Sequence, residues 1–304
     1  GGLLKFWTSW RETKDLVRKV RRQYQPAAVL GLGGYAAGVA VRYAAHKNLP
    51  TAILNPDVIP GKANQFLLRN VRAMCCQFEA TRGHVPPSQF SKIKVTGCPV
   101  RADIAHPPTR EEAMQRLGLT RQLLTLVVTG ASQGAITVND AVIGSLAALK
   151  LQGWQIVHLS GKEHAESVRS GYREIGVEAT VIDFTPAMAD VWATADLAVC
   201  RSGASTCAEL TACGVPAVLM PYPYHKDQQQ KLNAKVLADA GAAILLDDEK
   251  DKKKNVERLA PILQSLLHDA TRRSSMTAAA KSLGKPNAAA AVAGVIMQMI
   301  AAGR

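Results

Sequence analysis

The stretch LAVCRSGASTCAE, residues 197–209, decides how this chain folds. An apolar run, a turn at Gly203 and a helix-compatible run predict a strand, a tight turn and the start of a helix. The N–H groups and the dipole at a helix N-terminus favour a phosphate. Ser205 or Thr206 can add a hydroxyl, and Glu209, one turn further, can accept hydrogen bonds from a ribose. The stretch therefore predicts a site for a nucleotide diphosphate.

A second loop of this kind lies upstream. Leu124–Thr129 is apolar and β-branched, as in a buried parallel strand, and GASQGA at 130–135 separates it from a helical pattern over Thr137–Lys150. Ser132 and Gln133 supply donors. Neither loop matches a Walker P-loop or the dinucleotide fingerprint, and either alone could be an ordinary βα turn. Two such loops in one sheet favour the nucleotide site.

Strand and helix signals alternate through this half of the chain. Further strands are predicted at Ile156–Ser160, Ala179–Phe184, Leu197–Cys200, Ala217–Met220 and Ala243–Leu246. Alternation of this type predicts βα units and a parallel sheet. Ligands of such sheets bind at the carboxyl ends of the strands, where both loops fall.

A third segment, PYPYHKDQQQKLNA at 221–234, leaves a buried strand and opens a helix. Its amides Gln229, Gln230 and Asn233 suit a sugar, whose hydroxyls need both donors and acceptors. The alternative is a solvated first helical turn with Asp227 placed for the helix dipole.

These three loops, in this order, resemble the MurG family of peptidoglycan N-acetylglucosaminyltransferases. In the first half, Gly31–Gly38, Ile59–Asn64 and Gly97–Arg101 are similar to the family's GGY, IPG-x-x-N and G-N-P-V-R segments. The resemblance covers nearly the whole chain. It implies an α/β fold of the GT-B type, with two Rossmann-like parallel-sheet domains that face each other across a cleft, the N-terminal one incomplete.

The expected domains follow from this resemblance. Residues 1–102 form an N-terminal, acceptor- and membrane-facing domain, 103–122 a linker, 123–285 a UDP-sugar-binding domain, and 286–304 a C-terminal helix that returns to the N-terminal domain. A length of 304 residues, 47% of them hydrophobic, agrees with two globular α/β domains.

The resemblance implies transfer of N-acetylglucosamine from UDP-N-acetylglucosamine to lipid I, with inversion, to give lipid II. It needs no cofactor and no metal, and the chain has no Asp-x-Asp motif. The implied donor residues are Arg101, Ser132, Gln133, Phe184, Thr185, Ala204, Ser205, Thr206, Glu209, Gln229, Gln230 and Asn233. The implied acceptor residues are Gly33, Gly34, Tyr35, Asp57 and Asn64.

Two departures from the family concern catalysis. The family's Gly-rich segment ending in Gly-Gly-His has no equivalent here, and Leu54-Asn55-Pro56-Asp57 stands where the family has His-Glu-Gln-Asn. The neutral amide of Asn55 cannot act as a general base. No catalytic base is therefore assigned, and slow transfer by this chain alone is expected.

Positive charge gathers in the N-terminal part. Residues 1–100 hold 15 Lys or Arg against 4 Asp or Glu. Phe6, Trp7, Trp10 and Arg11 lie among these cations, as in a surface that contacts an anionic membrane. The alternative is that both tryptophans pack into the core. No run of eighteen apolar residues occurs, and no nucleic-acid motif accompanies the charge. We expect a peripheral protein on the cytoplasmic face of the inner membrane, with other cell-wall synthesis proteins as partners.

The spacing of the cysteines argues against a metal site and against disulfides. The six cysteines form no C-x-x-C pair, which favours reduced, packed thiols over a zinc site or a disulfide framework. Three other functions stay open: a UDP-sugar epimerase of similar architecture, a non-catalytic nucleotide-sugar-binding homologue, and one chain of a two-chain transferase. Regarding Arg201, a structural ion pair and a phosphate contact are equally compatible with the sequence.

Overall fold

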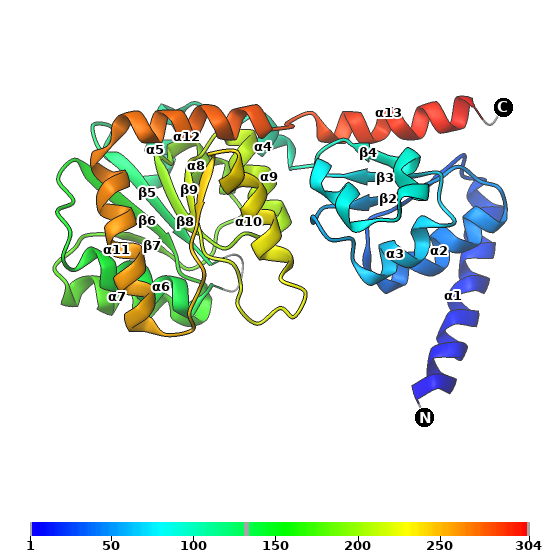
Figure 1. The fold of residues 1–304 in the computed structure, drawn as a ribbon, viewed down its shortest axis with the longest axis horizontal. Coiled ribbons are helices and arrows are strands. Elements are labelled where there is room, and N and C mark those ends of the chain that lie inside the picture. Colours follow the sequence, from blue (N-terminus) through cyan, green and yellow to red (C-terminus); the bar gives the residue numbers. More distant parts are fainter. Residues whose placement is uncertain (1, 131–133, 303–304) are drawn as a thin grey trace. The chain divides into compact units, whose positions relative to one another are not determined.

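The computed structural model describes residues 2–130 and 134–302, and for residues 2–9, 35 and 36 it describes the backbone alone. Contacts divide the chain into two units, each with one parallel sheet (Figure 1). Unit 1 comprises Gly1–Pro99 with Asn287–Arg304, and unit 2 comprises Val100–Pro286. The expected α/β class, with two Rossmann-like parallel sheets, is confirmed.

Unit 1 is a four-stranded sheet in the order β1-β2-β3-β4. Its strands are β1 (Val29–Gly31), β2 (Thr51–Asn55), β3 (Ala73–Cys76) and β4 (Ile93–Val95), and its helices are α1 (Gly2–Tyr24), α2 (Gly34–His46), α3 (Lys62–Leu68) and α13 (Ala288–Ala301), with 3₁₀ turns η1 (Glu79–His84) and η2 (Pro87–Lys92).

Helices cover both faces of this sheet. Neighbouring side chains of a strand point to opposite sides, so one strand can pack against helices on both faces. Ile53 packs in a cluster with Val41 of α2 and Leu67 of α3. The next residue, Leu54, packs on the other face with Val292 of α13. The C-terminal helix is thus part of the core of unit 1.

Unit 2 is a six-stranded parallel sheet in the order β10-β9-β8-β5-β6-β7. Its strands are β5 (Leu124–Thr129), β6 (Trp154–Leu159), β7 (Thr180–Ile182), β8 (Leu197–Cys200), β9 (Ala217–Leu219) and β10 (Ala243–Leu245). All six lie where the sequence predicts them. The two central strands, β5 and β8, match their predicted bounds, since apolar β-branched runs define buried strands clearly.

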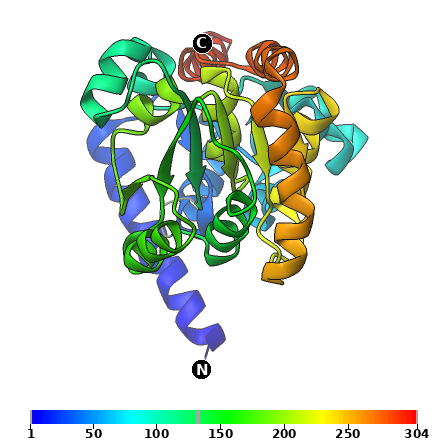
Figure 2. The ribbon, with the colours of Figure 1, turned by 90° about the vertical axis from the view of Figure 1, so that its left-hand side faces the viewer.

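Helices cover both faces of this sheet (Figure 2). One group is α6 (Ile136–Leu146), α7 (Ala165–Glu174), preceded by the turn η3 (Lys162–His164), and α11 (Lys252–His268). The other group is α4 (Ala102–Ala105), α5 (Arg110–Leu117), α8 (Met188–Thr194), α9 (Ala204–Cys213) and α10 (Gln229–Asp239). α12 (Ala270–Leu283) packs against both α9 and α11.

Residues 103–122, expected as a linker, instead carry a helix that packs on unit 2. A capping box between Thr109 and Glu112 starts α5, and Gly118 ends it in the left-handed conformation. The helix buries Met114, and Arg110 pairs with Asp196 at 2.6 Å. Buried apolar area and a tertiary ion pair hold this segment in place, neither of which a linker would have.

Candidate functional site

The two loops singled out in the sequence lie side by side in unit 2. β5 has β6 on one side and β8 on the other, so the direction of chain progression reverses between β5 and β8. Thr129 and Cys200, the last residues of these strands, are register partners. Both loops therefore leave the sheet at one level, at the topological switch point where open α/β sheets bind ligands.

The β8–α9 loop presents a helix N-terminus at this point. α9 begins at Ala204 after Gly203, an N-cap residue that has no side chain with which to cap the helix. Ser205 is exposed and Thr206 is half-buried in the first turn. The hydroxyl of the buried Ser202 instead donates to the Gln230 carbonyl, at 2.9 Å. The first turn of α9 thus offers hydroxyls and the positive end of a helix dipole to an anion.

The β5–α6 loop depends on a glycine. Gly134 has a φ of +76°, and a Cβ there would lie 2.0 Å from the Ser160 carbonyl oxygen. Only glycine allows this approach to the end of β6. Ser132 and Gln133, predicted as donors in this loop, lie outside the described residues.

Glu209 lies on α9, held by a neighbouring helix. The Trp192 indole nitrogen donates to its Oε2 at 2.8 Å. Burial raises the pKa of Glu209, whereas the hydrogen bond from Trp192 and the charge of Arg101 lower it. Arg101 is half-exposed and pairs with Asp103 at 3.2 Å. The structure therefore brings Arg101 and Glu209, two of the predicted donor residues, into one electrostatic neighbourhood.

Arg201 is a structural residue, which decides between the two roles that the sequence allowed. Its side chain is 7% exposed and pairs with the fully buried carboxylate of Asp248 at 2.8 Å. It also donates to the carbonyls of Met220 and Pro221 and to the hydroxyl of Thr137. The guanidinium thus joins segments that follow β8, β9 and β10 to the start of α6.

Asp248 is the acceptor that completes this cluster. Burial raises the pKa of Asp248, but hydrogen bonds from Thr137, Asn255, the Lys250 amide and Arg201 outweigh it and hold this pKa below its usual value. The carboxylate is therefore kept ionised, so that the buried guanidinium keeps its counter-charge.

The three predicted sugar amides have different surroundings. Gln230 Oε1 accepts from the Tyr222 amide at 2.9 Å. Asn233 is fully buried, and its amide donates to the Ser202 carbonyl at 3.3 Å. No hydrogen bond from a described residue reaches the half-buried Gln229 side chain. In this structure the amides of Gln230 and Asn233 each bind the backbone of a neighbouring loop.

Phe184 and Thr185 follow β7, the edge strand on the β6 side. The Phe184 ring is 52% exposed, with the Lys162 ammonium 5.9 Å from its centroid. Thr185 Oγ1 accepts from the Ala187 amide at 3.0 Å. An exposed aromatic ring at the carboxyl end of a strand can stack on a base.

The predicted acceptor residues of unit 1 gather at the carboxyl ends of β1 and β2. Gly33 and Gly34 open α2 with φ values of +101° and +78°. The Asn64 amide donates to the Leu54 carbonyl at 2.9 Å and to Asn55 Oδ1 at 3.2 Å. Asn55 in turn donates to the Asp57 carbonyl at 2.6 Å. Asn55 is therefore a buried structural amide. The side chain of Tyr35 lies outside the described residues.

The predicted membrane residues all lie on α1. Arg11 is exposed and Trp10 is half-buried, and the side chains of Phe6 and Trp7 lie outside the described residues. Further along the helix, Leu16, Val20 and Tyr24 are exposed at four-residue intervals, which places them on one face. Within the described residues, no helix has the length and apolar character that crossing a bilayer requires.

Comparison with known proteins decides the family. The model of the glycosyltransferase family 28 C-terminal domain matches residues 125–292. A UDP-N-acetylglucosamine–N-acetylmuramyl-(pentapeptide) pyrophosphoryl-undecaprenol N-acetylglucosamine transferase from Halothermothrix orenii is 34% identical over 276 residues, which cover 88% of this chain and 73% of the relative. The chain belongs to the MurG family. The correspondingly named protein of Anaeromyxobacter dehalogenans is 36% identical, over 97% of this chain and 72% of its own length.

Solved structures agree with membership of the MurG family. The crystal structure of Acinetobacter baumannii MurG matches with a TM-score of 0.76 and 26% identity, over 94% of this chain and 77% of that one. A UDP-GlcNAc 2-epimerase from Neisseria meningitidis, solved with UDP-GlcNAc, matches with a TM-score of 0.70 at 14% identity, over 95% and 81%. The likeness to the epimerase concerns the fold alone.

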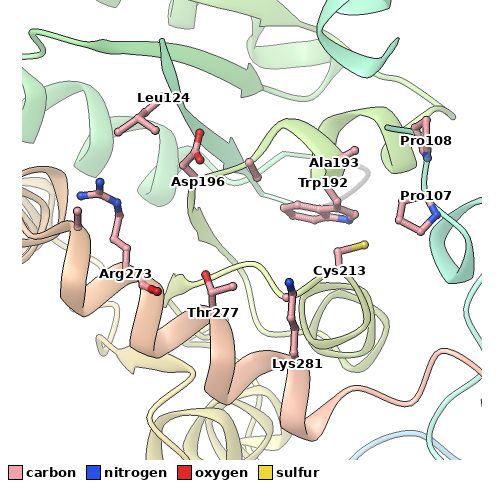
Figure 3. A pocket seen from close by; sticks show the side chains of 14 residues that line it. Pro107, Pro108, Leu124, Trp192, Ala193, Asp196, Cys213, Arg273, Thr277 and Lys281 are labelled. Carbon is pink, nitrogen blue, oxygen red and sulfur yellow. The ribbon is translucent and has the colours of Figure 1, made fainter. Parts of the chain in front are cut away.

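A separate pocket of about 480 Å³ lies at the opposite end of the unit 2 sheet. Leu124, the first residue of β5, and Asp196, which precedes β8, line it together with Arg273 and Lys281 of α12 (Figure 3). It contains none of the predicted ligand residues.

The sequence did not indicate three residues that make hydrogen bonds within this site. Trp192 reads as an apolar core residue, Thr137 as an ordinary helix residue, and Asp248 as one of several acidic residues after a strand. Only the position of Asp248 at the end of β10, on the same edge as the other loops, gave a signal. Trp192 is 17 residues from its partner Glu209, and Thr137 is 111 residues from Asp248.

Proposed function

We propose that this chain transfers N-acetylglucosamine from UDP-N-acetylglucosamine to lipid I, with inversion at the sugar, to form lipid II. The observation that carries this proposal is the pair of loops after β5 and β8, adjacent at the switch point, with Glu209 one turn into α9. Relatives at 34% and 36% identity carry the name of this activity.

The reaction exchanges one bond for another at C1 of the donor sugar. The C4 hydroxyl oxygen of the muramyl sugar attacks C1 from the face opposite UDP and releases its proton to solvent, and the electron pair of the broken C1–O bond leaves with UDP. Negative charge therefore grows on the diphosphate. The N-terminus of α9 favours that charge, so the site stabilises the departing group more than the intact donor.

Each donor residue is given one role in this proposal. Glu209 accepts hydrogen bonds from the ribose. The diphosphate is held by the side chains of Ser132, Gln133, Ser205 and Thr206 and by the Ala204 amide. Backbone groups near Phe184 and Thr185 hold the uracil. Gln229, Gln230 and Asn233 bind the sugar, and Gln230 and Asn233 also bind the backbone of their loops. Arg101 lies close to Glu209 and serves the charged substrates.

Acceptor binding is proposed for unit 1. Gly33, Gly34 and Tyr35 at the start of α2, with Asp57 and Asn64 after β2, border the lipid diphosphate. We also propose that Phe6, Trp7, Trp10 and Arg11 contact an anionic membrane surface on the cytoplasmic side. The proposed membrane contact is supported by the excess of Lys and Arg in the first hundred residues and by the exposed side chains of Leu16, Val20 and Tyr24.

The test uses the purified chain, sugar-labelled UDP-N-acetylglucosamine, and lipid I in anionic vesicles. We expect label to enter the lipid, and Glu209→Ala to reduce this by weakening UDP binding. An epimerase would instead isomerise the labelled sugar without lipid I. A chain that binds UDP but forms neither product would be a nucleotide-sugar-binding protein, which would overturn the proposed transfer.

A further inference from the structure

We propose that Trp192 is a positioning residue for nucleotide recognition, which holds the Glu209 carboxylate in the orientation that accepts the ribose hydroxyls. The inference rests on the proposed donor site. Its basis is the hydrogen bond from the Trp192 indole nitrogen to Glu209 Oε2, at 2.8 Å, between α8 and α9.

The hydrogen bond leaves half of the carboxylate for a ligand. Oε2 accepts from Trp192, and no hydrogen bond from a described residue reaches Oε1. A glutamate side chain has three rotatable bonds, and fixing it on ligand binding costs conformational entropy. Because Trp192 fixes the side chain beforehand, nucleotide binding does not have to bear that cost. Oε1 is then presented to the ligand in one orientation.

Trp192 can hold this position because it is itself fixed. The indole is 2% exposed, and its neighbours Val191 and Thr194 on α8 are also buried. Asp190 on the same helix pairs with Arg116 of α5 at 2.8 Å. The N–H of a buried indole needs an acceptor, and Glu209 supplies it. Each partner therefore satisfies the other, and movement of Glu209 would leave a buried donor unpaired.

The pKa of Glu209 lies above its usual value, and burial is the largest cause. Burial raises its pKa, the Trp192 and Arg101 contacts lower it, and Asp103 raises it. The neighbouring thiols of Cys200 and Cys213 have pKa values raised to about 12 by burial, so they are neutral at physiological pH. Without the indole N–H the carboxylate takes up a proton at higher pH. A protonated carboxyl is a poorer acceptor for ribose hydroxyls.

The indole is also placed so that a smaller ring can replace it. Trp192 lines the pocket at the far end of the sheet, beside Cys213, Pro107 and Lys281 (Figure 3). A phenyl ring in place of the indole keeps the apolar contacts of α8 and removes the N–H. Trp192→Phe therefore isolates the hydrogen bond. Trp154 supplies a matched control, since its buried indole donates to the Leu267 carbonyl at 3.2 Å, away from Glu209.

The experiment measures calorimetric affinities of UDP and of 2′,3′-dideoxy-UDP for the full chain, Trp192→Phe, Glu209→Gln, the double variant and Trp154→Phe. We expect Trp192→Phe to weaken UDP binding about tenfold, within the range for a hydrogen bond to a charged group, and to leave dideoxy-UDP binding unchanged. When the pH is lowered, the Trp192→Phe variant should lose UDP affinity at a higher pH than the parent chain does, because its Glu209 takes up a proton earlier. In the Glu209→Gln background Trp192→Phe should cause no further loss. Trp154→Phe should bind UDP like the parent chain.

Two results would overturn the inference while leaving the donor site standing. One is unchanged UDP affinity in a folded Trp192→Phe variant. The other is an equal loss for UDP and dideoxy-UDP, which would make Trp192 a packing residue only. A parent chain that does not bind UDP at all would instead overturn the proposed function, and this inference with it.

Discussion

Arg201 and Asp248 form a buried ion pair, 2.8 Å apart, although 47 residues separate them in the chain. The pair joins the loop after β8 to the loop after β10, and further hydrogen bonds from Arg201 reach the segment after β9 and Thr137 at the start of α6. One buried guanidinium group thus connects the loops that form the proposed donor site.

Removal of this guanidinium should destabilise unit 2 strongly. Arg201→Ala leaves the Asp248 carboxylate buried without its counter-charge, a change that costs about 3–5 kcal/mol in other proteins. Urea unfolding followed by circular dichroism measures the loss. Arg173→Ala is the matched control, because Arg173 pairs with Glu166 on the surface at 2.8 Å, where a pair contributes less than about 1 kcal/mol. Equal losses for the two variants would contradict a structural role for Arg201.

His158 should make unfolding depend on pH. It is fully buried, Tyr172 Oη lies 2.8 Å from Nδ1, and Asn139 Oδ1 lies 3.1 Å from Nε2, an arrangement that suits a neutral ring. Burial lowers the pKa of His158 to about 3, so the unfolded chain binds a proton that the folded chain excludes. The neutral His158 therefore favours the folded chain fully above pH ~6.5 only. Below that pH, protonation of the unfolded chain lowers the free energy of unfolding by about 1.4 kcal/mol per pH unit as the pH drops toward 3.

The measurement for His158 is the free energy of unfolding between pH 7.5 and 5. His158→Gln retains polar groups but does not titrate in this range, so its stability should change less with pH than that of the parent chain. Identical pH dependence in the two proteins would show that other groups dominate this range.

Asn55 should be intolerant of a carboxylate. Its amide donates to the Asp57 carbonyl at 2.6 Å and its Oδ1 accepts from Asn64. Asn55→Asp replaces that donor by an acceptor, so two oxygens face each other in a buried site, and we expect a loss of about 1–3 kcal/mol. Thermal unfolding compares it with Asn70→Asp, an exposed position in the same unit. If the two variants melt together, Asn55 is not the structural amide described above.

Replacement of Trp7 and Trp10 by Ser should lower partitioning onto anionic vesicles and leave UDP affinity intact. Aromatic rings anchor at the headgroup level, and Lys and Arg add attraction that salt screens. Vesicle sedimentation at low and high salt measures both contributions. Equal sedimentation of variant and parent chain would favour the alternative in which these tryptophans pack into the core.

The sequence by itself determined the elements and the loops of the site. β5 and β8 are apolar β-branched runs, and the Gly-containing segments after them mark the change from strand to helix, because these local preferences need no distant partner. The amides after β9 and the acidic residue in α9 could be placed on the same edge of the sheet for the same reason. The order of the strands, with β5 beside β8, is consistent with the expected Rossmann-like parallel sheet.

Only the tertiary structure decided which polar side chains bind the neighbouring loops and helices. The sequence predicts a sugar contact for Asn233 and allows either an ion pair or a phosphate contact for Arg201, and in the structure both side chains are buried and donate to backbone carbonyls. Trp192 resembles core, yet its N–H holds Glu209. The physical reason is that a hydrogen bond depends on distance and direction between groups that the fold brings together, and residue type and spacing along the chain do not contain that information.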